Sequence, residues 1–355
     1  MAEKQKLTAS QRAQLFAQAT RENRQMLPRM NATQGATTLQ CNLPKARLLS
    51  KVLFDVEGVV KIKHASETTL TPPPFAPYTL IRQIRLDLNN GFAPFAISGQ
   101  DIAMYNMVRL NPNIILPQNK NDRGYCFQPT YVASSAGTDN KFKFTVELPV
   151  ALNERDPIGL ILLQNDMTNV TLSIDIANDA DMFGNKEGFE ITLQNVDITP
   201  STHTFSLPAV QEAFPDLSVI KLVNSRVESV PGNGQNIIKL DTGTIYRKII
   251  IYATDVDGNP LNDSDINSNI ELVFNQADIN YSVRAETLAH INESQLGFAL
   301  PKGMFIFDFA YQGIPGLGGS RDYVDTEKLT EFWIRFSTKN ASKIHVISEK
   351  LARLK

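Results

Sequence analysis

Cysteine, histidine and long hydrophobic runs are all scarce in this sequence, and each scarcity excludes a class of protein. Only two of the 355 residues are cysteines, Cys41 and Cys126, and neither has a partner at a metal-binding spacing. A disulfide framework is therefore excluded, and both thiols are expected to be small, buried side chains of a protein made in a reducing cell. A chain of this length buries enough apolar surface to fold without cross-links.

The few histidines argue against a metal site of the kind found in β-barrel enzymes. All of them lie far apart in the sequence, whereas a cupin-type site needs two histidines with a single residue between them on one strand. The histidines are His64, His203, His290 and His345. We therefore expect isolated histidines in the core or on the surface, and we expect no metal and no other cofactor.

Two loop segments match ligand-binding motifs only in part. The segment from Asp255 to Asn259 begins like a calcium loop, but Pro260 and Ile266 occupy the sixth and twelfth positions, so a hairpin turn is favoured. The glycine-rich segment Gly313–Ser320 lacks the lysine of a phosphate-binding loop. No nucleophile or acid pair has a recognisable catalytic partner, and we expect the protein not to be an enzyme.

Membrane-spanning and nucleic-acid-binding classes are also disfavoured. No apolar run approaches the roughly 18 residues of a transmembrane helix, and Met1–Arg12 lacks the apolar centre of a secretory signal. With 35 Lys and Arg residues against 37 Asp and Glu residues, the formal net charge is −2. Direct binding to nucleic acid needs a basic surface and is not expected.

The N-terminal segment, residues 1–30, differs in charge from the rest of the chain. It contains six Lys or Arg residues and two Glu residues, a net charge of +4. The stretch from Thr8 to Leu27 has no Gly or Pro, a capping-box pattern at Thr8 and Gln11, and a stop at Pro28, which together predict one helix. We expect residues 1–35 to form a helical arm outside the β domains. Its predicted partner or membrane contacts are Arg12, Leu15, Phe16, Arg21, Arg24, Met26 and Leu27.

Beyond residue 36 the sequence alternates with period two and is rich in β-branched and aromatic residues, which predicts an all-β structure. Short helices are expected near Asp101–Val108 and Ser282–Ile291. The clearest strands are Val52–Ile62, Leu80–Leu88, Phe142–Leu148, Val170–Ile176, Phe189–Val196, Ser218–Val227, Ile245–Tyr252, Ile270–Phe274, Met304–Phe309, Glu331–Phe336 and Lys343–Ser348. So many short strands are typical of a sandwich or barrel.

A weak internal repeat divides the β region into two. Several short matches follow one another in the same order at a nearly constant offset along the chain. They pair Leu43-Pro44 with Leu207-Pro208, Thr79–Ile84 with Thr244–Ile249, Phe142–Val146 with Phe305–Phe309, and Arg155-Asp156 with Arg321-Asp322. The repeat predicts two tandem eight-stranded jelly rolls, residues 36–200 and 201–355, joined by a linker at residues 197–204.

The order of these elements resembles a known family of viral proteins. An N-terminal helix, two jelly rolls, and the segment Arg155–Gln164 leading into Val170–Ile176 are similar to the major capsid proteins of tectiviruses, most of all those of phages infecting Bacillus-type hosts. The resemblance implies a homotrimeric, pseudo-hexagonal capsomer in an icosahedral shell around an internal membrane. It also implies contacts with neighbouring capsomers, penton and minor capsid proteins, synthesis in the bacterial host cytoplasm, and a contact between the arm and the membrane.

Two other functions fit a β-sandwich chain. A phage spike or a receptor- or carbohydrate-binding jelly roll would carry exposed aromatic residues beside acidic loops, and the single tryptophan, Trp333, argues weakly against it. A secreted glycoside-processing enzyme is disfavoured because both a secretory signal and a carboxylate motif are missing.

Overall fold

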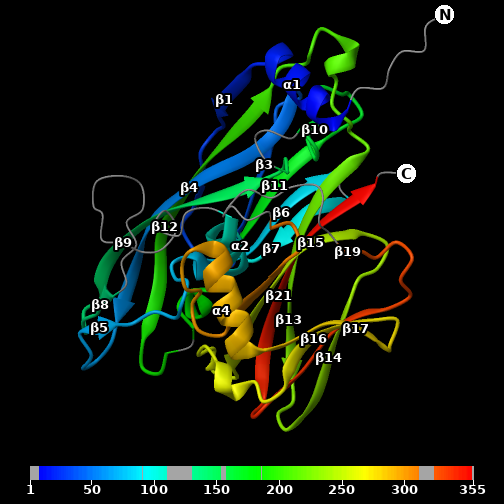
Figure 1. The fold of residues 1–355 in the computed structure, drawn as a ribbon. Coiled ribbons are helices and arrows are strands. Elements are labelled where there is room, and N and C mark those ends of the chain that lie inside the picture. Colours follow the sequence, from blue (N-terminus) through cyan, green and yellow to red (C-terminus); the bar gives the residue numbers. More distant parts are fainter. Residues whose placement is uncertain are drawn as a thin grey trace, which may run out of the picture.

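The computed structural model describes residues 8–89, 91–109, 130–152, 157–184, 186–311 and 324–353 (Figure 1). Four features that the sequence singled out lie outside these residues. They are Cys126, Arg155-Asp156, Gly313–Ser320 and Arg321-Asp322.

The first half of the chain forms two facing sheets. In one sheet, β12 lies between β4 and the short strands β1 and β2, and β9 pairs with the other side of β4. In the other sheet the order is β3-β11-β6-β7. The bounds are β1 Glu22–Met26, β2 Met30–Ala32, β3 Thr38–Asn42, β4 Leu48–Lys63, β6 Ile81–Leu88, β7 Phe92–Ile97, β9 Thr138–Pro149, β11 Val170–Ile176 and β12 Glu190–Phe205.

The second half repeats this arrangement. Its sheets have the orders β13-β21-β15-β18 and β14-β20-β16-β17. The bounds are β13 Val219–Val230, β14 Gly234–Leu240, β15 Ile245–Asp255, β16 Asn269–Phe274, β17 Asp278–Arg284, β18 Met304–Asp308, β20 Phe332–Thr338 and β21 Ser342–Arg353. Each half also has two-residue strands outside this arrangement. They are β5 Thr69–Leu70, β8 Tyr131–Val132 and β10 Ile161–Leu162 in the first half and β19 Val324–Asp325 in the second.

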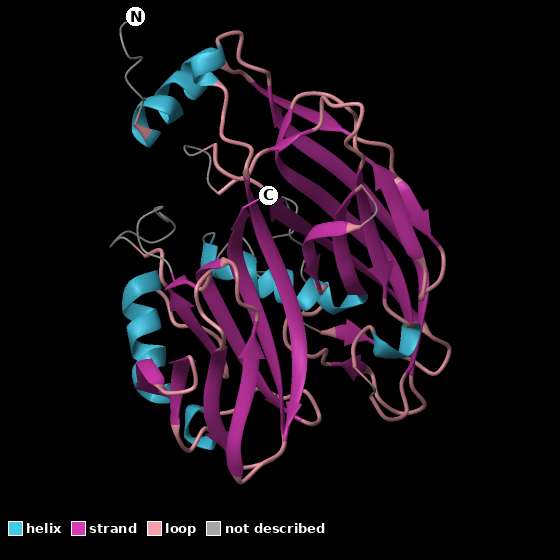
Figure 2. Cartoon of the chain, turned by 90° about the vertical axis from the view of Figure 1, so that its right-hand side faces the viewer, coloured by secondary structure: helices cyan, strands magenta, loops and turns pink. Residues whose placement is uncertain are grey.

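Both halves have the same strand order. Counting β1 and β2 as one strand, the first sheet of each half contains strands one, eight, three and six, and the second contains strands two, seven, four and five. This is the strand order of an eight-stranded jelly roll, so the chain is a double jelly roll, as the sequence predicted. Figure 2 shows the strands in two groups with helices beside them.

The α-helices in the described part of the chain lie at three places around the strands. Helix α1 precedes the first roll, α2 follows its fifth strand, and α4 follows the fifth strand of the second roll. Their bounds are α1 Ala9–Ala19, α2 Gly99–Arg109 and α4 Ala285–Leu296, with single 3₁₀ turns at Tyr78–Leu80, Asp179–Asp181, Gln211–Ala213 and Asp263–Asp265. Both predicted internal helices are present, although residues 282–284 of the second belong to β17.

All eleven predicted strands coincide with observed strands, but the predicted residue pairing of the two halves is only partly right. Phe142 and Phe305 do lie on equivalent strands, the sixth of each roll. Arg82 lies on the fourth strand of the first roll, whereas Arg247 lies on the third strand of the second. The loops of the two rolls differ in length. A constant offset in residue number therefore aligns strands that are similar in composition but occupy different positions in their rolls.

The predicted helix at the N-terminus begins correctly and ends too late. The Thr8 capping box with Gln11 is present, but the helix ends at Ala19, where the Thr20 hydroxyl donates to the Phe16 carbonyl over 2.7 Å. Residues 22–26 and 30–32 pair antiparallel with β12 and form the first strand of the first roll. The prediction of an arm outside both sandwiches is therefore wrong for residues 22–32. The long strand β12 offers them main-chain hydrogen-bond partners, and this pairing outweighs the helix propensity of residues such as Glu22, Arg24 and Met26.

The predicted linker is wrong for a related reason. Residues 197–204 lie inside β12 and pair with β4 through their whole length. The chain leaves the first roll only after Phe205.

The two rolls share one continuous sheet. Strand β7 of the first roll pairs in parallel with β13 of the second, with Phe95 opposite Val223 and Ala96 opposite Asn224. One hydrophobic cluster fills the first roll and reaches residues of the second, such as Tyr252, while another fills the second roll. The junction is therefore part of the core and holds the rolls in a fixed relation.

Candidate functional site

The predicted N-terminal contact residues fall into two groups. Phe16 and Leu27 are buried, at 5% and 7% exposure, and belong to the packing of the subunit itself. Leu15 is half-buried. The residues left on the surface are Arg12, Arg21, Arg24 and Met26, with Met26 at 72% exposure. Only this second group is exposed enough to meet a partner.

Phe16 explains how α1 is held on the first roll. Its ring packs edge-on against Phe205 with ring centroids 5.3 Å apart, and it joins a small buried cluster with Leu48 and Leu160. Burying one phenylalanine stabilises a contact by roughly 1.5 to 3 kcal/mol. The helix is thus fastened by one aromatic anchor at the end of β12.

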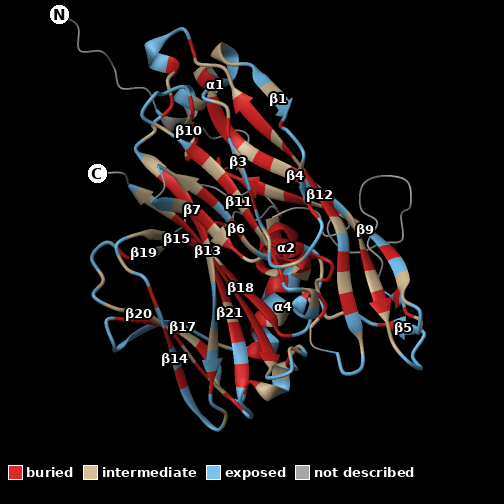
Figure 3. Cartoon of the chain, turned by 180° about the vertical axis from the view of Figure 1, so that it is seen from behind, coloured by how far each residue is buried: buried red, intermediate tan, exposed pale blue. Residues whose placement is uncertain are grey.

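A second group of functional interest is a set of buried charges where the rolls meet. Helix α2 is covered on both sides, by the first roll and by the second (Figure 3). From it, Asp101 lies 2.9 Å from Nδ1 of His345, and the Tyr105 hydroxyl donates to the Glu349 carboxylate. Arg247 Nε donates to the same carboxylate over 3.1 Å. Polar contacts between α2 and β21 therefore hold the two rolls together.

Burial and charge shift the pKa values of this junction cluster. Burial lowers the pKa of Lys221 to about 7, and its Nζ donates to the Ala151 carbonyl over 2.8 Å. Burial would raise the pKa of Glu349, but the positive charges of Lys221, Lys248 and Arg247 outweigh it and bring that pKa to about 2. Glu349 is therefore ionised at neutral pH despite its burial.

Among the basic side chains of this cluster, Lys221 is bonded to a carbonyl and not to a carboxylate. Arg109 pairs with Glu147, Lys248 pairs with Asp308, and Arg247 pairs with Glu349. Lys221 has no carboxylate of its own in this set. The lowered pKa of Lys221 follows mainly from its burial, which the nearby Glu349 carboxylate only partly offsets.

The buried amine of Lys221 predicts a pH dependence of stability. The lysine pKa falls from 10.5 to about 7 on folding, so between these values the unfolded state binds more protons and the free energy of unfolding rises with pH. The rise is at most about 1.4 kcal/mol per pH unit. We expect Lys221→Met to lose this rise, as measured by urea unfolding at pH 7, 8 and 9, while exposed Lys141→Met keeps it. Parallel pH profiles for wild type and Lys221→Met would refute the assignment.

Sequence reasoning missed this cluster, although a signal was present. Arg247 and Lys248 interrupt the apolar run of β15, and Glu349 and Lys350 interrupt that of β21. Charges at positions with apolar neighbours on both sides mark a buried ionic site. Their partners on α2 and β13 are distant in sequence and could not be paired with them.

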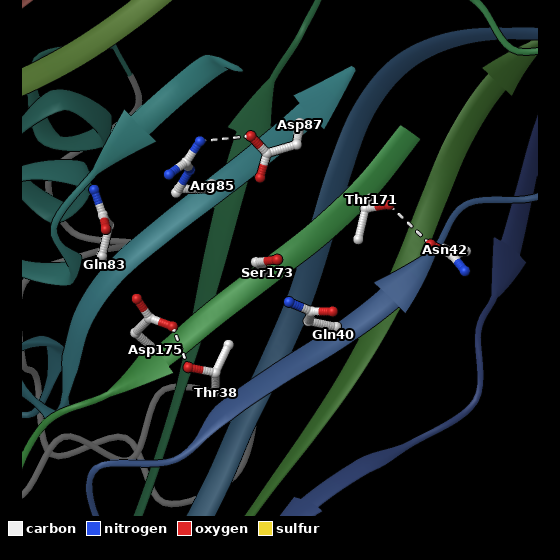
Figure 4. Close-up of a pocket in the computed structure, with 9 residues that line it drawn as sticks. All are labelled: Thr38, Gln40, Asn42, Gln83, Arg85, Asp87, Thr171, Ser173 and Asp175. Carbon is white, nitrogen blue, oxygen red and sulfur yellow. Dashed lines mark hydrogen bonds and ion pairs between the residues drawn. The ribbon is translucent and has the colours of Figure 1, made fainter. Parts of the chain in front are cut away.

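The outer face of the β3-β11-β6 sheet forms a shallow polar hollow (Figure 4). It is lined by Thr38, Gln40, Asn42, Gln83, Arg85, Asp87, Thr171, Ser173 and Asp175. Asp175 accepts from Thr38 over 2.7 Å and Asp87 accepts from Arg85 over 2.7 Å, so both acids have partners. None of these lining residues is aromatic, which disfavours a sugar-binding face.

The other candidate binding segments do not form a ligand or metal site among the described residues. The Asp255 carboxylate accepts the main-chain N–H groups of Asp257 and Asn259 at 2.9 and 2.8 Å, so this segment is the predicted hairpin turn. Within the residues that the structure covers, no three His, Cys, Asp or Glu side chains gather as metal ligands would. Trp333 lies on β20 with Lys239 Nζ 5.9 Å from its ring centre.

Two further observations concern membranes and thiols. No helix among the described residues is long and apolar enough to cross a membrane. Cys41 is a free, half-buried thiol, and burial raises its pKa.

The fold is similar to that of solved protein structures along nearly the whole length of the chain. No protein-family model matches the chain, and no curated protein matches it by sequence. Among solved structures, the major capsid protein of Sulfolobus Turreted Icosahedral Virus superposes with a TM-score of 0.69 at 16% identity, over 94% of this chain and 97% of that one. VP54 of PBCV-1 gives 0.64 at 9% identity over 95% of both chains, and the major capsid protein P2 of bacteriophage PM2 gives 0.54 at 12% identity over 94% and 98%. The double jelly-roll fold is thereby shared with capsid proteins of several viruses.

Proposed function

We propose that this chain is the major capsid protein of an icosahedral virus. The observation that carries the proposal is the match of the double jelly roll to viral major capsid proteins over nearly the full length of each compared chain. Jelly rolls also serve other functions, but a fused pair with a shared sheet is a building block of fixed shape. Such a block suits a lattice and needs no catalytic site.

The proposed assembly is a homotrimer. Three chains with two similar rolls each place six similar units around one axis, so a threefold oligomer occupies a pseudo-hexagonal lattice position. Further proposed partners are neighbouring capsomers, penton proteins and minor capsid proteins. The proposed location is the virion shell, after synthesis in the cytoplasm of a bacterial host.

The finer assignment is to a tectivirus-type phage of Bacillus-like hosts, with an internal membrane. In the structure, the residues available to meet anionic lipid or a neighbouring protein are Arg12, Arg21, Arg24 and Met26. We also place the boundary between the rolls after Phe205, where β12 ends, instead of at residue 200.

Native mass spectrometry and negative-stain microscopy test the proposal. We expect a particle of three times 39.5 kDa with a pseudo-hexagonal outline. Dithiothreitol should leave it intact, because Cys41 is unpaired in the subunit and half-buried. A monomer at micromolar concentration would remove the basis of the lattice argument, and thin elongated trimers would favour the spike alternative.

A further inference from the structure

The two rolls of one chain meet where an edge strand of the first roll pairs with the first strand of the second roll. The fifth strand of the first roll, β7, pairs with the first strand of the second roll, β13. The helix that follows β7, α2, packs against the outer face of the sheet that contains β13 and β21. In this contact, the fifth strand of one roll and the helix after it pack against the first strand of the other roll and the sheet that contains that strand.

The other fifth strand, β17, and the other first strand, β1, have no such partner strand among the described residues of the subunit. Strand β17 is the fifth strand of the second roll, and all of its residues except Val283 are exposed. Strand β1 belongs to the first strand of the first roll, and only Asn23 in it is not exposed. Both are edge strands, which natural proteins rarely leave as open templates.

The fifth strands and their helices can be aligned residue by residue. Asn106 of α2 donates to the carbonyl of Glu147 on the sixth strand, and Asn292 of α4 donates to the carbonyl of Ile306 on the other sixth strand. The two asparagines therefore occupy equivalent places, and the difference between their numbers gives the offset that aligns the rolls here. The same offset relates the cross-strand pair of Leu86 and Phe95 to that of Leu272 and Tyr281.

Equivalent positions in this alignment differ in burial. Phe95 and Tyr105 are completely buried, at 0% exposure, where Phe95 lies opposite Val223 of the second roll and Tyr105 donates to Glu349. Their counterparts Tyr281 and Ile291 are 39% and 38% exposed. Large apolar side chains thus lie uncovered on the second roll at the positions where the first roll makes its contact.

The receiving surfaces align through a shared bulge. The third strand of each roll has one extra residue opposite the eighth strand, between Tyr246 and Lys248 in β15 and between Leu49 and Lys51 in β4. This bulge places His203 at the position of Glu349. The residues that face these two on the first strands are Arg24 and Val223, and the next residues along are Gln25 and Asn224.

We propose that β17 and α4 of one subunit dock onto β1 and the outer face of β12 in the next copy of this chain, repeating the contact that β7 and α2 make with β13 and β21. This inference rests on the proposed trimer and names its contact surfaces. It places Tyr281 beside Arg24 and Ser282 beside Gln25 of the neighbour, as Phe95 lies beside Val223 and Ala96 beside Asn224. Such a head-to-tail contact closes a ring when the rotation fits, here after three chains.

The two surfaces are chemically complementary. The donor surface has exposed Ile279, Tyr281 and Ile291, with Asp278 and Glu286 at its border. The receiving surface has exposed Arg21 and Arg24, and an arginine over a tyrosine ring adds to the burial of the apolar side chains. A second copy therefore pairs the open strand edges and covers the exposed apolar side chains together.

Engineered disulfides test the contact in the full-length protein. In a background with Cys41→Ser and Cys126→Ser, Gln25→Cys is combined with Ser282→Cys, whose α-carbons would face each other as those of Ala96 and Asn224 do. The control combines Gln25→Cys with Gln235→Cys on β14, the opposite edge of the same sheet. Non-reducing electrophoresis and native mass spectrometry are run on both variants.

We expect covalent dimers and trimers in the first variant and none in the control. A native trimer without cross-linking would overturn the proposed surfaces and leave the capsid assignment standing, whereas the absence of any trimer would count against the proposed function itself.

Point substitutions give a second readout that does not depend on disulfide geometry. Ile291→Asp should raise the concentration for half-dissociation of the trimer roughly tenfold or more, because a charge would be buried in the contact. Ile237→Asp, at a similarly exposed isoleucine of β14, should leave it unchanged. Equal effects of the two substitutions would refute the assignment of α4 to the interface.

Discussion

Removal of residues 1–32 should prevent the first jelly roll from folding into a soluble form. The deletion removes β1 and β2, and with them every pairing along one side of β12 between Val196 and Phe205. It also removes Leu27 and Phe16 from the core and leaves Asp197, buried at 4% exposure, without Arg29 and Asn31. Losing two large apolar side chains and exposing a buried carboxylate costs several kcal/mol, comparable to the roughly 5 to 15 kcal/mol stability of a whole domain.

The matched control is a chain that begins at residue 20. It lacks α1 and the Phe16 anchor but keeps β1 and β2, so we expect it to remain soluble and to melt several degrees lower. Expression level, far-ultraviolet circular dichroism and thermal midpoint distinguish the two truncations. A soluble chain of residues 33–355 with an unchanged melting curve would show that the N-terminal strand is dispensable.

The contrast between these truncations depends on information that local sequence pattern does not contain. Alternation of apolar residues predicted strands such as Val170–Ile176 correctly, because one face of that strand lies in the core. Glu22–Met26 has no alternation, and all of its residues except Asn23 are exposed in the subunit. Its strand conformation is imposed by the open edge of β12, which is formed by residues much later in the chain.

Sequence pattern also failed where position within the fold, and not composition, identifies a residue. The matched strings around Arg82 and Arg247 are similar in composition, yet they belong to different strands of their rolls. Strand β6 is exposed on one face, whereas β15 is buried at nearly every position. The junction cluster needs the side chains of Tyr105, Lys221 and Glu349 to meet from three elements that are far apart in the sequence. Only the tertiary structure shows that these side chains lie close together.

Glu349→Gln should destabilise the subunit by about 3 to 5 kcal/mol, the usual cost of removing one partner from a buried ion pair. The carboxylate accepts hydrogen bonds from Tyr105 and Arg247 at the centre of the junction. With a neutral amide in its place, Arg247 remains buried without a compensating charge. The loss should therefore affect both rolls at once and lower a single unfolding transition.

Glu228→Gln on β13 is the matched control, since the side chain of Glu228 is 44% exposed beside Arg226 and its removal should change stability by less than about 1 kcal/mol. The double variant Glu349→Gln with Lys221→Met should regain part of the loss, because an apolar side chain replaces a buried amine that has lost the nearby Glu349 carboxylate. A double-mutant cycle measured by urea unfolding gives the coupling between the two positions. If Glu349→Gln unfolds like the control, the junction charges do not hold the rolls together, and the apolar contacts of α2 and β7 must carry that role alone.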